Sequence, residues 1–325
     1  SAVKPGLRVD FNRYAPDQTF LGLTSFVLRN NTTDWTSMHE RISMQLFQRL
    51  GVPAPREAHT KLFINGAYVG LYSIVESIDK NFLARTRNEN DGYLYKFDRN
   101  LGDEPYYFTY GGADPDLYVP HPFEPETQES DPHPAPLVDM IRTVAEASDA
   151  GFRDAIAPYL DLGAFIKHVA IEMFLNETDG VLGDYGTTNF YLYRPPDSSL
   201  HAFIPWDKSE TMHDRTQPIF HDVDDVPEEI QNRIMTRAMK YPDLVNLYLE
   251  VLNASADSAA EPTDGDPRGW MEREVEREFD QIRDAVLADP QKPFTNDDFL
   301  QAVDDLRKFA QDRPTFVKTS VANKR

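Results

Sequence analysis

Residues 176 to 207 contain acidic and amide side chains in an order that suits metal-assisted phosphate transfer. Asp179 and Asp184 lie in a polar, glycine-containing stretch that follows an apolar segment, and Asn189 opens the next strand-like run. Asp207 ends a second strand-like run, in the sequence Pro-Trp-Asp. Oxygen ligands of this kind bind Mg²⁺ that is also held by phosphates. Protein kinases use a base Asp, a metal-binding Asn and a metal-binding Asp in this same chain order.

The spacing of these residues has little specificity by itself. Asp184 and Asn189 have the five-residue offset of the kinase pattern D-x-x-x-x-N. Asp and Asn are also common in turns, where their side chains bind the backbone, so solvated loop acids explain the same letters. The pattern therefore leaves Asp179 and Asp184 open as alternatives for the catalytic position.

The N-terminal part of the chain offers charged residues that a phosphate site also needs. In kinases a strand lysine, paired with a helix glutamate, contacts the phosphates of the nucleotide. Lys4 and Glu40 are the first candidates, and Lys61 and Lys96 are alternative strand lysines. Glu40 also has a purely structural interpretation, because it completes a capping box with Ser37 at a helix start.

The elements of the first 80 residues are predicted in the order strand, strand, helix and hairpin. Asn65-Gly66, a dipeptide that tolerates positive φ, marks the hairpin turn. The chain then crosses from Glu76 to Asp79, where a kinase has its hinge against the adenine. The expected elements are strands 7–11 and 22–28, helix 37–50, and hairpin strands 60–64 and 68–75.

The rest of the chain is predicted to be mainly helical. Residues 111–136 hold seven of the 24 prolines, and proline interrupts both helices and central strands, so 103–136 is expected to be an irregular insertion. An apolar stripe makes 162–175 a central helix. The other expected elements are strands 92–97, 189–193 and 200–205, and helices 137–147, 152–159, 231–252, 270–287 and 297–311.

Composition excludes several classes of protein. The 325 residues include 54 Asp and Glu against 33 Lys and Arg, a net charge of −21, and no cysteine. Nucleic-acid binding is disfavoured because it depends on Lys and Arg that neutralise phosphates, and thiol catalysis and disulfide scaffolds need cysteine. No run of 18 apolar residues predicts a membrane span, and residues 1–10 lack the apolar core of a signal peptide. The start at Ser1 fits a chain that has lost upstream sequence.

Two blocks of the sequence resemble the CotH family of spore-coat and secreted proteins. The first is MHERISMQLFQRLGVPAPREAHTKLFINGAYVGLYSIVESIDKNFL at 38–83, with the helix, the G-V-P-A-P turn, the N-G hairpin and G-L-Y-x-x-V-E of that family. The second comprises NFYLYR at 189–194 and IPWD at 204–207, and the opening KPGLRVDFNRY is also similar. A chance match of both blocks in the right order is improbable.

The resemblance implies an atypical, secreted protein kinase with an α+β, protein-kinase-like fold of two lobes. A small nucleotide-binding lobe is expected at 1–80, truncated at its N-terminus relative to the family, and a helical catalytic lobe at 81–325. The implied reaction transfers the γ-phosphate of ATP, with Mg²⁺ or Mn²⁺, to Ser or Thr of secreted or coat proteins. The implied location is outside the cell, at the cell surface or in the spore coat.

The same resemblance implies roles for individual residues. Asp179, in Thr-Asp-Gly, corresponds best to the catalytic Asp, whereas Asp184 fits ordinary kinase spacing better. Asn189 and Asp207 are the expected metal ligands. The expected nucleotide-binding residues are Lys4, Glu40 and Glu76.

Some kinase motifs are absent as written. The chain has no G-x-G-x-x-G loop, no H-R-D and no D-F-G, and Glu210 stands where the family often has a second acid after P-W-D. The alternative function is a non-catalytic surface or coat protein that keeps the fold for adhesion or assembly. It predicts no nucleotide binding and acids that do not converge.

Overall fold

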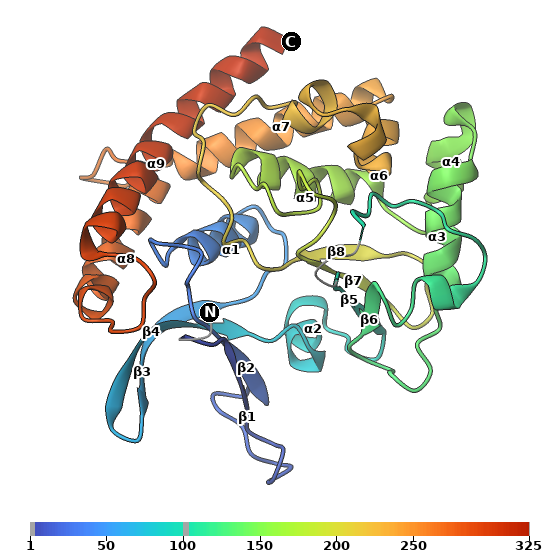
Figure 1. Cartoon of the computed structure of the whole chain (residues 1–325). Coiled ribbons are helices and arrows are strands. Elements are labelled where there is room, and N and C mark those ends of the chain that lie inside the picture. The colour runs from blue at the N-terminus through green and yellow to red at the C-terminus, as the bar shows by residue number, and fades with distance from the viewer. Residues whose placement is uncertain (1–3, 100–103, 325) are drawn as a thin grey trace.

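The computed structural model of the chain describes residues 4–99 and 104–324 (Figure 1). The first three residues of the expected small lobe, the first residue of the expected insertion and the C-terminal Arg325 lie outside the described residues. The expected boundary at residue 80 coincides with the start of a helix, α2, and as a lobe boundary it stays a prediction.

The first sheet has the strand order β1-β2-β4-β3, with every neighbouring pair antiparallel. The predicted hairpin is β3–β4, and its turn residues Asn65 and Gly66 both have positive φ, 51° and 81°, as a type I′ turn requires. Arg29, the last residue of β2, pairs with Ser73 of β4. The strands are β1 Leu7–Asp10, β2 Ser25–Arg29, β3 Glu57–Ile64 and β4 Ala67–Glu76.

Helix α1, His39–Arg49, connects β2 to β3 and begins differently from the predicted capping box. Asp34 supplies the cap: its Oδ2 accepts from the His39 N–H at 2.8 Å and its Oδ1 from the Thr36 N–H at 2.9 Å. Ser37 has a φ of 60° and makes no capping bond to the helix. The capping role predicted for Ser37 and Glu40 is therefore wrong, and the Glu40 carboxylate remains available for another partner.

The second sheet, with the order β6-β5-β7-β8, is antiparallel and lies under the central helix α5, Leu162–Phe174. Helix α2, Lys80–Arg87, connects the two sheets and was not predicted; Asp79 caps it by accepting from the Asn81 N–H at 2.8 Å. The strands are β5 Tyr93–Phe97, β6 Phe123–Pro125, β7 Phe190–Arg194 and β8 Ala202–Pro205.

Residues 104–134 are mostly irregular but are firmly packed. This segment contains the 3₁₀ turn η1, Pro115–Leu117, and the strand β6. Phe108, Tyr118 and Phe123 are buried in the main core, so apolar anchors hold the proline-rich chain in place.

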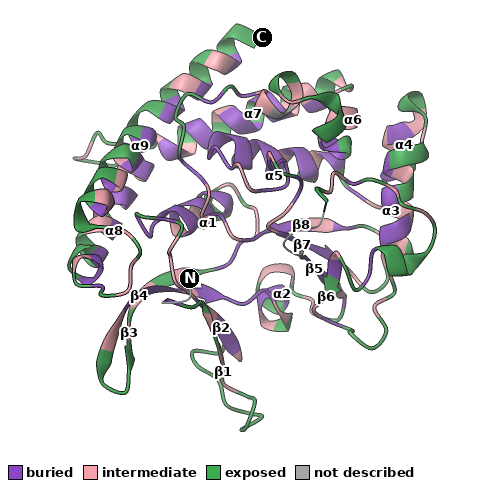
Figure 2. Ribbon diagram, viewed as in Figure 1, coloured by how far each residue is buried: buried purple, intermediate pink, exposed green. Residues whose placement is uncertain are grey.

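Most of the remaining helices lie around α5 and the second sheet, and α8 lies beside β4, whereas β1 and the turn end of β3 extend away from the helices (Figures 1 and 2). The helix expected at 231–252 is broken, because Pro242 begins a new helix and cannot continue the previous one. The last helix extends well past 311, through Pro314. The helices are α3 Ala135–Glu146, α4 Phe152–Ile156, α6 Arg233–Ala238, α7 Pro242–Ala259, α8 Trp270–Leu287 and α9 Asn296–Lys324. The short elements are the 3₁₀ turns η2 Asp149–Gly151 and η4 Glu228–Ile230 and the single π-helical turn η3 His221–Asp225.

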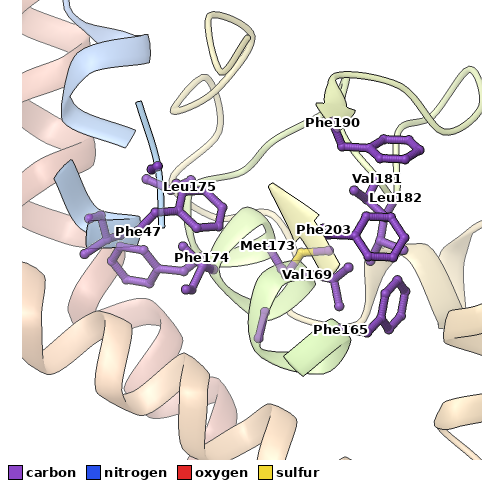
Figure 3. Packing of buried hydrophobic residues seen from close by; sticks show 14 of the residues in the cluster. Phe47, Phe165, Val169, Met173, Phe174, Leu175, Val181, Leu182, Phe190 and Phe203 are labelled. Carbon is purple, nitrogen blue, oxygen red and sulfur yellow. The ribbon is translucent and has the colours of Figure 1, made fainter. Parts of the chain in front are cut away.

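One large hydrophobic core joins α1, α5, α7 and the second sheet. Figure 3 shows two of its regions around α5, with Phe47 beside Phe174 and Leu175, and Val181 and Leu182 close to Phe203. The loop that follows α5 is thus anchored in the core by its own apolar residues. Within residues 4–99 and 104–324, no helix has the length and hydropathy needed to span a membrane.

Candidate active site

The loop after α5 and the start of β7 bring Asp179 and Asn189 together. The Asn189 side-chain N–H donates to the Asp179 carboxylate at 2.9 Å and to the Asp179 carbonyl oxygen at 2.7 Å. Burial raises the pKa of Asp179, Lys208 opposes this rise and Asp207 adds to it. Asn189 and Asp207, the predicted metal ligands, therefore both act on the carboxyl group of Asp179.

Asp207 lies two residues after the end of β8 and has a left-handed backbone, with φ 46°. Its Oδ1 accepts from the Ser209 hydroxyl at 3.1 Å, and its Oδ2 accepts from Arg29 at 2.5 Å. Asp207 therefore forms a charged contact between the segment after β8 and the end of β2.

Arg29, at the end of β2, bridges this aspartate to helix α1. Its Nη2 donates to Glu40 Oε1 at 3.2 Å, and its guanidinium lies 4.8 Å from the centre of the Trp206 ring. Burial raises the pKa of Glu40 to about 7, although Arg29 opposes the rise. A strand cation paired with a helix glutamate is the arrangement that positions phosphates in kinases.

Lys4 does not occupy that position. Its ammonium group lies 2.8 Å from Asp289 Oδ2 and donates to the Leu71 carbonyl at 2.7 Å, which fastens the start of the chain to β4 and to the turn after α8. The predicted Lys4–Glu40 pair is thus replaced by Arg29–Glu40. Arg29 lies one residue beyond the strand expected at 22–28, although it shares a face of β2 with Val27, and only lysines were expected in this role.

Asp184 lies near Asp179 in sequence but has a different partner. Its carboxylate is 3.4 Å from His221 Nε2 in η3, and His221 Nδ1 is 3.4 Å from Asp225. The described contacts therefore associate Asp179, and not Asp184, with Asn189. The choice between them as catalytic residue stays a prediction.

The Glu76 carboxylate is held by two arginines. Arg56 Nη2 is 2.8 Å from its Oε1 and Arg85 Nη2 is 2.6 Å from its Oε2. This ionic cluster fixes the crossover between the sheets, and a contact of Glu76 with nucleotide stays a prediction. Glu210, the other acid considered near Pro-Trp-Asp, pairs with His213 at 3.4 Å.

A small cavity of about 70 Å³ lies between β2, α1 and the segment after β8. Arg29, Glu40, Asp207 and Ser209 are among its lining residues. It is smaller than typical ligand pockets of about 300–1,000 Å³, so a nucleotide would need the Arg29–Asp207 contact to open. Beside Arg29, an apolar cluster that includes Val75, Ile78, Tyr191, Ile204 and Trp206 fills the space between the two sheets.

On this α+β fold the chain thus has a strand cation paired with a helix carboxylate, an Asp after a hairpin, and a loop Asp bonded to a strand Asn, which are the kinds of group that protein kinases use. The family of the chain follows from its sequence. The model of the family described as CotH kinase protein matches residues 2–317, so the chain belongs to this family.

Individual known proteins show more distant similarity. The inner spore coat protein H of Bacillus subtilis (strain 168) is 23% identical over 305 residues, which cover 94% of this chain and 80% of that protein. The Helicobacter pylori proinflammatory kinase CtkA has 10% identity and a TM-score of 0.36, over 92% of this chain and 90% of its own. A chain of the Shewanella oneidensis MR-1 HipA, HipB and operator DNA complex has 12% identity and a TM-score of 0.37, over 98% of this chain and 66% of its own. Neither TM-score reaches 0.5, so the family assignment depends on the sequence match.

Proposed function

We propose that this chain is an ATP-dependent protein kinase that transfers the γ-phosphate to Ser or Thr of spore-coat or secreted proteins. The observation that carries the proposal is the Arg29 bridge, which joins the helix carboxylate Glu40 to Asp207 at the small cavity that these residues line. The name of the Bacillus subtilis relative supports a role in the spore coat. In its wider form, the proposal is that the substrate is a polypeptide located outside the cell.

The available oxygen ligands fit a magnesium or manganese ion that is also bound by the phosphates of ATP. Asp207 offers a carboxylate and Asn189 an amide oxygen, and Mg²⁺ is commonly held by one or two protein oxygens together with substrate phosphates. Among residues 4–99 and 104–324 no group of three or more His, Asp or Glu side chains forms a cage for a metal. A site completed by ATP is therefore a better fit than a permanently bound ion. When bound, the ion would neutralise charge on the phosphates.

The residues of the chain have distinct tasks in the proposed reaction. Arg29, held by Glu40, takes over the phosphate-binding role first considered for Lys4. Asp179 orients the hydroxyl of the acceptor and takes its proton as the bond from that oxygen to the γ-phosphorus forms. The bond from the γ-phosphorus to the β,γ-bridging oxygen breaks, and ADP leaves with that oxygen.

Nucleotide binding requires a rearrangement of this cavity. Arg29 now neutralises Asp207, so the two groups must separate before Asp207 can face a metal ion and Arg29 a phosphate. The apolar cluster of Val75, Ile78 and Ile204, next to the crossover that follows Glu76, is the proposed region for the adenine. The adenine is expected to displace or repack these side chains.

The direct test is transfer of label from γ-labelled ATP, with Mg²⁺ or Mn²⁺, to a generic protein substrate or to the chain itself. Asp207→Ala is expected to abolish transfer, and Asp243→Ala is the matched control because the exposed Asp243 pairs with Arg153 of α4. Absence of transfer from the intact wild-type chain with either metal would contradict the proposal.

The closed Arg29–Asp207 contact also favours a second candidate, a non-catalytic coat or surface protein that retains the fold. In that case Arg29 is a permanent clasp between the two sheets. ATP with Mg²⁺ would then cause no increase in the melting temperature, whereas a kinase that binds ATP is stabilised by it.

A further inference from the structure

Lys208, the residue after Asp207, lies at the centre of a buried charged cluster that the sequence did not reveal. Its side chain is completely buried, with 0% exposure. Its ammonium group is 2.7 Å from Glu172 Oε1 and 3.5 Å from Glu177 Oε2, and it donates to the carbonyl oxygen of Asn189 at 3.1 Å. One cation thus connects helix α5, the loop after it and the start of β7.

The two glutamates of this cluster in turn hold the backbone of the loop. Glu177 Oε1 accepts from the N–H of Asp179 at 2.8 Å, and Glu172 Oε2 accepts from the N–H of Val181 at 3.0 Å. The loop wraps closely around both carboxylates. A Cβ at Gly180 would lie 2.5 Å from Glu177 Cγ and 2.9 Å from Glu172 Oε1. Glycine is therefore needed between the two bonded amides.

The charges in the cluster explain why the cation is needed. Burial raises the pKa of Glu172, but Lys208 and His168 outweigh burial and bring this pKa to about 2. Glu172 is thus an anion in the interior, and a buried anion without a partner is strongly destabilising. His168 Nε2 lies 3.2 Å from the same Glu172 oxygen, so the histidine supports the pair from the other side.

We propose that Lys208 is a positioning residue of the phosphate-transfer site, which sets the relative positions of Asp179, Asn189 and Asp207 without touching substrate. It acts through Glu177 on Asp179, through a carbonyl bond on Asn189, and through the chain itself on Asp207. The catalytic part of this inference rests on the proposed function, whereas the ordering of the loop does not.

The test compares Lys208→Met with the double variant Lys208→Met/Glu172→Gln. The single variant leaves Glu172 as a buried, uncompensated anion, so part of its effect is loss of stability. The double variant removes both charges and is expected to regain most of the melting temperature. Because misplacement by about 1 Å can cost about 100-fold in rate, both variants are expected to lose about that much in kcat, with little change in KM for ATP.

Arg237→Met is the matched control. Arg237 is also a largely buried cation bound to backbone carbonyls, those of Val144 and Ala147, but it belongs to α6. It is expected to alter stability and leave kcat of the folded protein unchanged. If the double variant regains the wild-type kcat, or if neither variant loses it, Lys208 is only structural and the inference is overturned.

Hydrogen–deuterium exchange separates this inference from the proposed function. In both Lys208 variants the amides of residues 177–190 are expected to exchange faster, while those of α7 and α9 keep their protection. Unchanged exchange in the loop would overturn the positioning role whether or not the protein is a kinase. If the wild type transfers no phosphate but the loop loses protection, only the proposed function fails.

Discussion

At the scale of single residues, Arg29 is the side chain on which the proposed chemistry depends most. Arginine stays charged at every physiological pH and can donate to two oxygen acceptors at once. In the structure it divides its guanidinium between Glu40 and Asp207. ATP bound with a metal ion would offer a phosphate oxygen to Arg29 and the metal ion to Asp207. The Glu40 contact can persist while the Asp207 contact is exchanged for a phosphate.

Replacing Arg29 is therefore expected to weaken nucleotide binding. A hydrogen bond to a charged group contributes about 1.5–3 kcal/mol, so Arg29→Met should raise the dissociation constant of ATP with Mg²⁺ by about tenfold or more. Arg29→Lys should recover part of the affinity. Isothermal titration calorimetry measures the effect, with Arg307→Met as the control because Arg307 pairs with Glu276 between α8 and α9. Equal affinity of Arg29→Met and wild type would remove Arg29 from the phosphate site.

Asp179 and Asp184, the two candidates for the catalytic base, lead to opposite predictions for their variants. Asp179→Asn keeps the side-chain volume and an acceptor for Asn189, but it removes the proton acceptor, so we expect a loss of about 100-fold or more in kcat. Asp184→Asn alters the contact with His221 and should keep most of the activity. Steady-state rates of label transfer measure both variants. The reverse order of the two effects would assign the base to Asp184.

The site could be predicted from sequence only in part. The sequence singled out Asp207 and Asn189 because strand ends and turn residues can be recognised in it, and their roles as metal ligands stay predictions. Arg29 was missed because ion pairs between segments depend on which strand face meets the helix. Lys208 was missed for a related reason: a lysine in a polar segment looks solvated, and only the packing of α5 against the loop buries it.

At the scale of elements, the start of α1 determines where Glu40 lies. Asp34 accepts from the N–H groups of Thr36 and His39 and from the Thr36 hydroxyl at 2.7 Å. Loss of an N-terminal cap costs about 0.5–2 kcal/mol, so Asp34→Ala should lower the free energy of unfolding by about that amount. Ser37→Ala, at the residue that the sequence favoured as the cap, should change it much less. Urea unfolding compares the two, and a larger effect of Ser37→Ala would contradict the observed cap.

The order of the elements was largely predictable, and their ends were less so. The helix expected at 270–287 has those bounds because its apolar stripe and its flanking glycine agree. The helix expected at 231–252 is divided because Pro242 acts locally whereas apolar periodicity continues across it. Helix α9 continues through Pro314, and the buried Arg313 beside it donates to the carbonyls of Phe174 and Met173, a long-range contact that periodicity cannot reveal.

At the scale of the whole molecule, the net charge of −21 includes acids that the fold buries. Glu278 of α8 is fully buried beside Arg41, and burial raises its pKa to about 8 although Arg41 opposes the rise. Glu177 behaves alike, because burial raises its pKa to about 8 against the attraction of Lys208. Both carboxyls bind their protons more tightly in the folded chain than in the unfolded chain.

Because of this difference in proton binding, the free energy of unfolding depends on pH. Between the ordinary glutamate value of 4.5 and about 8 the folded state holds more protons, so the free energy of unfolding falls as pH rises. Burial also lowers the pKa of His59 and of His201 to about 4, which makes stability rise with pH up to their ordinary value of 6.5. Above pH 6.5 the glutamates act without this opposition.

We therefore expect the free energy of unfolding to fall between pH 6.5 and 8, by up to about 1.4 kcal/mol per pH unit for each such glutamate. The melting temperature should fall with it. Glu278→Gln keeps the shape of the side chain and has no proton to lose, so it should flatten the slope. Calorimetry at constant ionic strength measures both proteins, since salt also screens the repulsion among surface acids. A wild-type melting temperature that is constant or rises over this range would show that these carboxyls are already ionised in the fold.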